Sequence, residues 1–201
     1  MLLLGHTGLT LGAAVIIGGA WPAGRRQPGA AVRRGWGQVE GWFLRLARRA
    51  DIRLLLIGSL LPDIIDKPVG QVWLRDSIGS GRIYAHSLLF LLGLAVVGLA
   101  WYRLRAGNGP LLLAAGVLAH LVFDQMWLEP VSLLWPLQGL AFPRTYYDGW
   151  AGSLWQDLLH KPSTYIPEIA GGVVLCLFAA VLWRRRAFRA FLLRGRLEGQ
   201  G

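Results

Sequence analysis

The apolar residues of this chain are gathered into five runs, which are separated by polar or charged segments. The runs cover residues 2–21, 52–66, 83–104, 110–128 and 166–183. A helix that crosses a bilayer needs roughly 20 mostly apolar residues, so the second run is too short unless it continues past Pro68 as a kinked helix. The pattern predicts an all-α membrane bundle of about five transmembrane helices.

The segments between the runs have their own character. Residues 35–49 mix aromatic and aliphatic side chains with arginines, which is typical of a helix lying in the membrane interface. Residues 129–165 form a long connection rich in Trp and Tyr, which favours a position at the membrane surface or over a site. We therefore expect one transmembrane domain over residues 1–183, followed by a basic tail over residues 184–201.

Composition supports a membrane protein. Hydrophobic residues make up 54% of the chain and charged residues only 16%, whereas soluble domains carry about a quarter charged residues. The first run has no Lys or Arg before its apolar core, so we interpret it as a retained helix rather than a cleaved signal peptide.

The distribution of charge predicts the orientation. The formal net charge is +10, and 16 of the 21 Lys and Arg residues fall in the first and third connections and the tail. Basic residues are enriched on the cytoplasmic side of a membrane. We expect the N-terminus outside, the C-terminus inside, and the inner (cytoplasmic) membrane as the location. The arginines would then contact anionic lipid, and no basic segment indicates a nucleic-acid partner.

Ionisable side chains converge on the predicted outer leaflet. Four of the five expected helices each bring His or Asp there: His6, Asp63 and Asp66, His86, and His120 with Asp124. His120 and Asp124 are four residues apart and are expected on one face of a helix, with His86 about one turn into its own helix. An Asp at a helix centre costs ~2.5–3.5 kcal/mol on insertion scales, and coordination of a cation would offset that cost.

Imidazole with carboxylate suits a divalent metal, with zinc preferred and manganese as an alternative. The six residues are therefore candidate metal ligands. Each also has a simpler reading. His6 could be an interfacial histidine, the two aspartates of residues 63–66 could serve a turn, and His120 with Asp124 could join helices by hydrogen bonds. Glu168 is expected to favour the N-terminus of its own helix, and His160 to be a solvated loop residue.

Several short motifs resemble a known family. They are Gly5-His6, the segment 61–66 (Leu-Pro-Asp-Ile-Ile-Asp), the segment 85–88 (Ala-His-Ser-Leu), the segment 120–124 (His-Leu-Val-Phe-Asp) and Leu134-Trp135-Pro136. Their order and spacing over roughly residues 1–140 are similar to those of the LexA-regulated, membrane-bound metal-dependent hydrolase family. The resemblance implies a bacterial membrane hydrolase.

The leading hypothesis is a metal-dependent hydrolase at the outer membrane interface, acting on a lipid-like substrate such as a phospholipid phosphoester. Asp66 and His86 are then candidate catalytic groups, and Arg82 a candidate phosphate ligand. Two alternatives remain open at this point. Intramembrane His and Asp also mark the ion paths of cation or proton transporters, and a polar cluster can merely hold a non-catalytic membrane scaffold together.

Overall fold

The computed structural model describes residues 2–20, 35–144, 150–195 and 197, and the secondary structure of these residues is helical. The elements are α1 (Leu3–Ala20), α2 (Trp36–Arg49), α3 (Ile52–Pro68), the π-helical turn η1 (Val69–Trp73), α4 (Leu88–Arg105), α5 (Gly109–Phe123), the 3₁₀ turn η2 (Met126–Leu128), α6 (Pro130–Leu133), α7 (Trp150–His160), α8 (Pro162–Arg184) and α9 (Phe188–Arg194). The predicted all-α class is confirmed.

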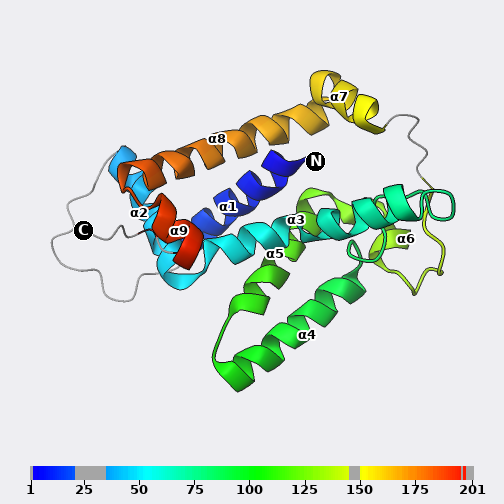
Figure 1. Cartoon of the computed structure of the whole chain (residues 1–201), viewed down its shortest axis with the longest axis horizontal. Helices are drawn as coiled ribbons and strands as arrows, with labels where there is room; N and C mark the ends of the chain where they lie inside the picture. The colour runs from blue at the N-terminus through cyan, green and yellow to red at the C-terminus, as the bar shows by residue number, and fades with distance from the viewer. Residues whose placement is uncertain (1, 21–34, 145–149, 196, 198–201) are drawn as a thin grey trace.

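The five long helices α1, α3, α4, α5 and α8 alternate in direction along the longest axis of the molecule (Figure 1). Two of them, Leu88–Arg105 and Pro162–Arg184, are long and apolar enough to cross a membrane, and Leu3–Gly18 and Gly109–Phe123 are shorter apolar helices. The outer face of α4 carries exposed apolar side chains, with Val96 67% exposed, as expected for a surface in contact with lipid. Five spans, and their orientation, stay a prediction.

Helix boundaries differ from the apolar runs in three places. The second helix does continue past Pro68, because α3 passes directly into the π-helical turn η1. The helix expected to begin at residue 83 begins instead at Leu88, where the Ser87 hydroxyl caps it by accepting from Phe90 N. The helix expected to reach residue 128 ends at Phe123. The later start of α4 and the earlier end of α5 change the local structure around the predicted site residues His86 and Asp124.

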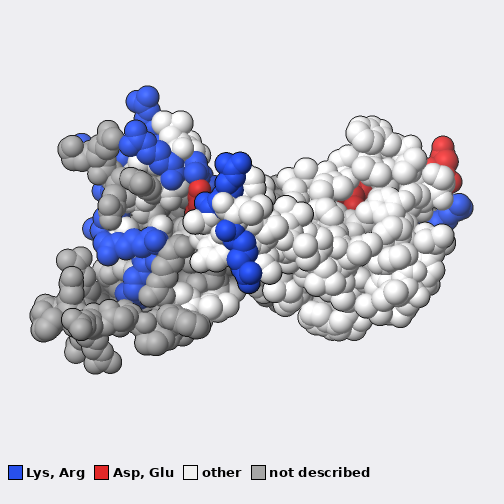
Figure 2. Space-filling model, turned by 90° about the horizontal axis from the view of Figure 1, so that it is seen from below, with Lys and Arg blue, Asp and Glu red and all other residues white. Residues whose placement is uncertain are grey.

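One end of the molecule is basic. Figure 2 shows Lys and Arg gathered at the left of the face it displays, the end where α2 and α9 lie in Figure 1, with mostly uncharged surface to the right. Helix α2 is amphipathic there, as predicted: Phe43 and Leu46 are buried in a core with Phe178 and Phe191, and Glu40 pairs with Arg185. The basic residues of positions 21–34 and 196 lie outside the described part of the chain.

The connection expected over residues 129–165 contains two helices that the sequence did not predict. Helix α6 begins at Pro130, and helix α7 ends at His160, next to the start of α8. The aromatic residues Tyr146 and Tyr147 of this connection lie outside the described residues.

Glycines bring the helix backbones into contact. A Cβ added at Gly8 of α1 would lie 2.1 Å from the Gly171 carbonyl oxygen of α8, and one at Gly116 of α5 would lie 2.4 Å from the Leu55 carbonyl oxygen of α3. Small residues at helix crossings are how membrane helices approach closely. The α3–α5 crossing lies next to the residues described below.

A candidate metal centre at one end of the bundle

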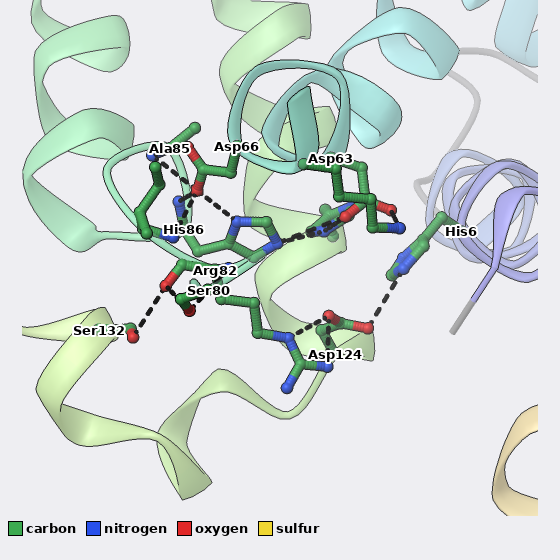
Figure 3. Close-up of polar contacts among 12 residues, drawn as sticks. His6, Asp63, Asp66, Ser80, Arg82, Ala85, His86, Asp124 and Ser132 are labelled. Atoms are coloured by element: carbon green, nitrogen blue, oxygen red, sulfur yellow. Dashed lines mark hydrogen bonds and ion pairs between the residues drawn. The ribbon is translucent and has the colours of Figure 1, made fainter. Parts of the chain in front are cut away.

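The predicted His and Asp residues lie on or next to the ends of α1, α3 and α5 that point away from the basic end of the molecule (Figure 1). His6 lies in the first turns of α1, Asp63 and Asp66 in the last turns of α3, His86 in the connection before α4, His120 in the last turn of α5, and Asp124 at its C-cap. Figure 3 shows the side chains of Asp63 and His86 pointing toward one another, and likewise those of His6 and Asp124, from their separate segments. The histidines and Asp66 are fully buried.

Asp63, His86 and His120 form the tightest group. The Nε2 atoms of His86 and His120 are 3.2 Å apart, and Asp63 Oδ1 lies 3.6 Å from the first and 3.9 Å from the second. The other oxygen of Asp63 accepts from Lys67 Nζ at 2.6 Å. Three atoms with lone pairs therefore face one small volume.

The opposite nitrogen of each imidazole in this group has its own partner. His86 Nδ1 lies 2.7 Å from Asp66 Oδ2, and His120 Nδ1 lies 2.6 Å from the Ser59 carbonyl oxygen. A carbonyl oxygen only accepts, so His120 Nδ1 carries a proton, and Asp66 Oδ2, which already accepts from two backbone N–H groups, likewise accepts from His86 Nδ1. The nitrogen of each ring that is turned toward the other ring is then Nε2. Such outer partners orient the histidine ligands of metals in proteins.

Asp66 has a second role in the backbone. Its carboxylate accepts from the backbone N–H groups of Ile83 at 2.8 Å, Ala85 at 3.0 Å and His86 at 3.1 Å. These bonds fold the connection before α4 around the end of α3. Two groups among the described residues could hold a metal, and Asp66 belongs to neither; its oxygens are occupied by the chain itself. Its direct ligation of a metal stays a prediction without geometric support.

A second group consists of His6, His120 and Asp124. The His6 and His120 rings are stacked with centroids 3.9 Å apart, and His6 Nε2 lies 3.2 Å from Asp124 Oδ1. Neither ring nitrogen of His6 has a partner with hydrogen-bond geometry among the described residues. The two groups share His120.

Arg82 lies next to this second group, on the side of the cavity described below. Its Nε and Nη2 atoms lie 3.1 and 2.9 Å from Asp124 Oδ2, and Nη1 pairs with Glu129. Burial acts to lower the pKa of Arg82, but the carboxylates of Asp124 and Glu129 outweigh it and raise the pKa above its usual range. Arg82 is therefore a permanent cation beside the His and Asp cluster.

A cavity of about 1000 Å³ opens from the cluster. Its polar wall contains the side chains that reach it from the cluster, namely Asp63, Lys67, Arg82 and Asp124. Its apolar wall comes from α1, the end of α5, the turn η2 and the start of α8, through Leu9, Phe123, Trp127 and Ile166 respectively. The three histidines lie behind the carboxylates, fully buried.

The comparison with known families bears on this arrangement. A model of the YdjM inner membrane protein family matches residues 1–190. The chain belongs to the YdjM inner membrane protein family. The resemblance drawn from the motifs is thereby confirmed, and so is the inner membrane as location. No match was found among curated proteins or solved structures.

Within this member of the YdjM family, the setting of three predicted residues needs correction. His86 does not lie in a helix; it precedes the cap of α4, in the connection that Asp66 organises. Asp124 lies at the C-cap of α5 rather than within the helix, but its N–H still donates to the His120 carbonyl oxygen as in a helix, and the two side chains lie on one side as expected. His160 is exposed as predicted, although it is the last residue of α7 rather than part of a loop.

Glu168 also has a different role. It lies inside α8, and its carboxylate accepts from the backbone N–H groups of Leu2, Leu4 and Gly5 at 2.7–3.0 Å. It therefore caps α1, not its own helix, and fixes the start of the segment that carries His6. The cause is the close crossing of α1 and α8 at Gly8 and Gly171.

Sequence reasoning missed Lys67, Ser59 and Glu129 as neighbours of the cluster. Lys67 had a readable signal, because it lies four residues after Asp63 on one helix. Ser59 contributes a backbone carbonyl, which any residue would provide, so no side-chain pattern points to it. Glu129 reaches Arg82 only because the chain turns back after α5.

Proposed function

We propose that this protein is a metal-dependent hydrolase whose site lies at the outer membrane interface and whose substrate is an amphipathic lipid phosphoester. The observation that carries the proposal is the pair of Nε2 atoms, of His86 and His120, that face each other at 3.2 Å with Asp63 Oδ1 beside them. A divalent cation placed among these two imidazole nitrogens and the carboxylate oxygen would be coordinated by all three at once.

The donor set fits the metals expected from the sequence. Imidazole nitrogen and carboxylate oxygen suit zinc, with manganese as the alternative, and the buried histidines keep their ligand atoms away from bulk water. A divalent ion held by these residues would supply Lewis-acid polarisation of the substrate and lower the pKa of a bound water toward 7.

Residues on the cavity wall could bind the phosphate group and the acyl chain of such a substrate. Arg82 is a permanent cation on the wall of the cavity, and its partner Glu129 has a side chain that is 42% exposed. A phosphate can compete with this half-exposed carboxylate for the Nη1 side of the guanidinium, while Asp124 keeps the Nε side in place. The apolar wall then suits an acyl chain, and the hydrolysis breaks a P–O bond as water adds to phosphorus and a proton goes to the leaving alcohol.

The test uses purified full-length protein in mild detergent, first analysed for metal and then incubated with phosphatidylethanolamine and phosphatidylglycerol in mixed micelles. Phosphorus NMR would report a new phosphomonoester or inorganic phosphate, dependent on zinc or manganese and abolished by a chelator. His86→Ala is expected to abolish the signal, and His160→Ala, on the exposed end of α7, to preserve it.

Two outcomes would count against the proposal in different ways. A protein that binds no divalent metal under any loading condition would rule out the metal-dependent mechanism and favour the scaffold reading. A protein that binds metal but releases no phosphate species would rule out the lipid phosphoester as substrate. Bound metal should also stabilise the fold by ~4 kcal/mol at a thousandfold excess over its dissociation constant, which thermal unfolding with and without chelator measures.

A further inference from the structure

The two candidate metal groups compete for one residue. His120 is a member of both, and its Nδ1 is already taken by the Ser59 carbonyl oxygen at 2.6 Å. An imidazole with one nitrogen committed to such a bond has only the other left for a metal. His120 therefore offers only Nε2, and that atom lies next to His86 Nε2 and Asp63 Oδ1.

The two groups also differ in how well their ligands are prepared. In the Asp63–His86–His120 group, both imidazoles have their outer nitrogen fixed, by Asp66 and by the Ser59 carbonyl. His6, in the other group, has no such outer partner among the described residues. Because an outer hydrogen bond sets the tautomer and orientation of a ligating histidine, only the first group is organised for coordination before a metal arrives.

We infer that the cluster binds one ion, not two, and that Asp63, His86 and His120 hold it. His6 and Asp124 are then not ligands but a neighbouring His–Asp pair, which Arg82 orients through Asp124 Oδ2. This inference rests on the proposed metal dependence and goes beyond it by fixing the number of ions and dividing the six predicted ligands into separate roles. Asp66 becomes a positioning residue for His86.

The experiment measures zinc per chain and zinc affinity in the full-length protein, in mild detergent, by elemental analysis after loading and by calorimetric titration. Four conservative variants are compared with wild type. Asp63→Asn and His86→Gln alter the proposed ligands, and Asp124→Asn and His6→Gln alter the neighbouring pair. His120 is left intact because both groups would lose it. A single symmetric peak in size-exclusion chromatography serves as the folding criterion for each variant.

The expected result is one zinc per wild-type chain and at least a roughly tenfold loss of affinity in Asp63→Asn and His86→Gln. Asp124→Asn and His6→Gln should each lose clearly less than roughly tenfold, because their side chains would act on the ion only through the contact of His6 with His120. If one of the two ligand variants fails to fold, the zinc affinity of the other and the number of zinc ions per wild-type chain still test the assignment.

Contrary results separate this inference from the proposed function. Two ions per wild-type chain, or loss of zinc in His6→Gln or Asp124→Asn with retention in His86→Gln, would overturn the assignment while leaving metal dependence intact. Loss in all four variants would show one ion shared by both groups and would also overturn it. If the wild-type protein bound no zinc at all, that result would instead contradict the proposed function itself.

Discussion

The replacement Asp66→Asn tests whether the connection before α4 depends on one buried carboxylate. Asp66 is fully buried and accepts from three backbone N–H groups, those of Ile83, Ala85 and His86, as well as from His86 Nδ1. Asparagine has nearly the same shape but only one accepting oxygen. Its NH₂ group, placed at Oδ1, would face the N–H of Ala85, which would keep only its second bond, to the oxygen at Oδ2, at 3.1 Å.

The magnitude follows from these contacts. The N–H of Ala85 loses one of its two accepting oxygens and faces an NH₂ group instead, which costs about 1 kcal/mol. The remaining three bonds change from charge-assisted to neutral, which weakens each by about 1 kcal/mol. Because asparagine no longer buries an ionised group, part of this loss is offset, and we expect a net cost of ~2–4 kcal/mol. That cost favours local opening of residues 83–86 over unfolding of the whole bundle, since the helices keep their own contacts.

Hydrogen exchange followed by mass spectrometry measures this directly. A cost of ~2–4 kcal/mol corresponds to roughly thirtyfold to several-hundredfold faster exchange of the amides in residues 83–86. Asp76→Asn is the matched control, because Asp76 is an exposed carboxylate in the segment between η1 and α4, and it should leave these rates within about threefold of wild type. Unchanged exchange at residues 83–86 in a folded Asp66→Asn protein would refute the positioning role of Asp66.

Three further predictions concern the bundle. Gly116→Ala should lower zinc affinity and thermal stability, because its Cβ would lie 2.4 Å from a backbone oxygen of α3. Gly93→Ala is the control: an added Cβ there has nothing within 4 Å, so zinc affinity should stay unchanged and thermal stability should stay equal or rise. Equal zinc affinity in the two variants would contradict this prediction. Glu168→Gln should lower the thermal stability of the protein by weakening the charged cap of α1 by about 1 kcal/mol, and an unchanged melting curve would count against it. Ser77→Cys should react with an impermeant maleimide on intact cells and Asn108→Cys only after lysis, each in a background without the native cysteine; the reverse pattern would invert the predicted orientation.

Much of the fold was readable from the sequence because lipid-facing helices are made of uninterrupted apolar residues. The runs over residues 2–21 and 166–183 correspond to α1 and α8 within a few residues. Errors of boundary arose where apolar residues continue beyond the helix. Hydrophobicity predicts that residues 83–87 are helical, yet buried Ile83 and Ala85 belong to a connection whose N–H groups bond to Asp66 instead of to a helical turn.

The membership of the polar cluster was also readable, since a membrane rarely retains unpaired His and Asp and these residues fell at the same end of successive helices. Their individual roles were not. Asp63 and Asp66 have the same side chain and lie three residues apart, but Asp63 faces two imidazole nitrogens and the cavity, while Asp66 turns to a backbone segment. Only the path of the chain after α3 separates the two, and spacing on a helix does not contain it.

The geometry of the cluster depends on backbone contact more than on its polar side chains. Gly58 and Gly116 allow α3 and α5 to touch, with an added Cβ at either lying under 2.5 Å from a carbonyl oxygen of the other helix. This contact brings the Ser59 carbonyl within 2.6 Å of His120 Nδ1, which in turn leaves Nε2 facing His86. A bulkier residue at the crossing would move the carbonyl away and free His120 to turn. The small residues of the crossing therefore act together with the proposed ligands at its end, because helix packing determines which nitrogen of His120 is available to a metal.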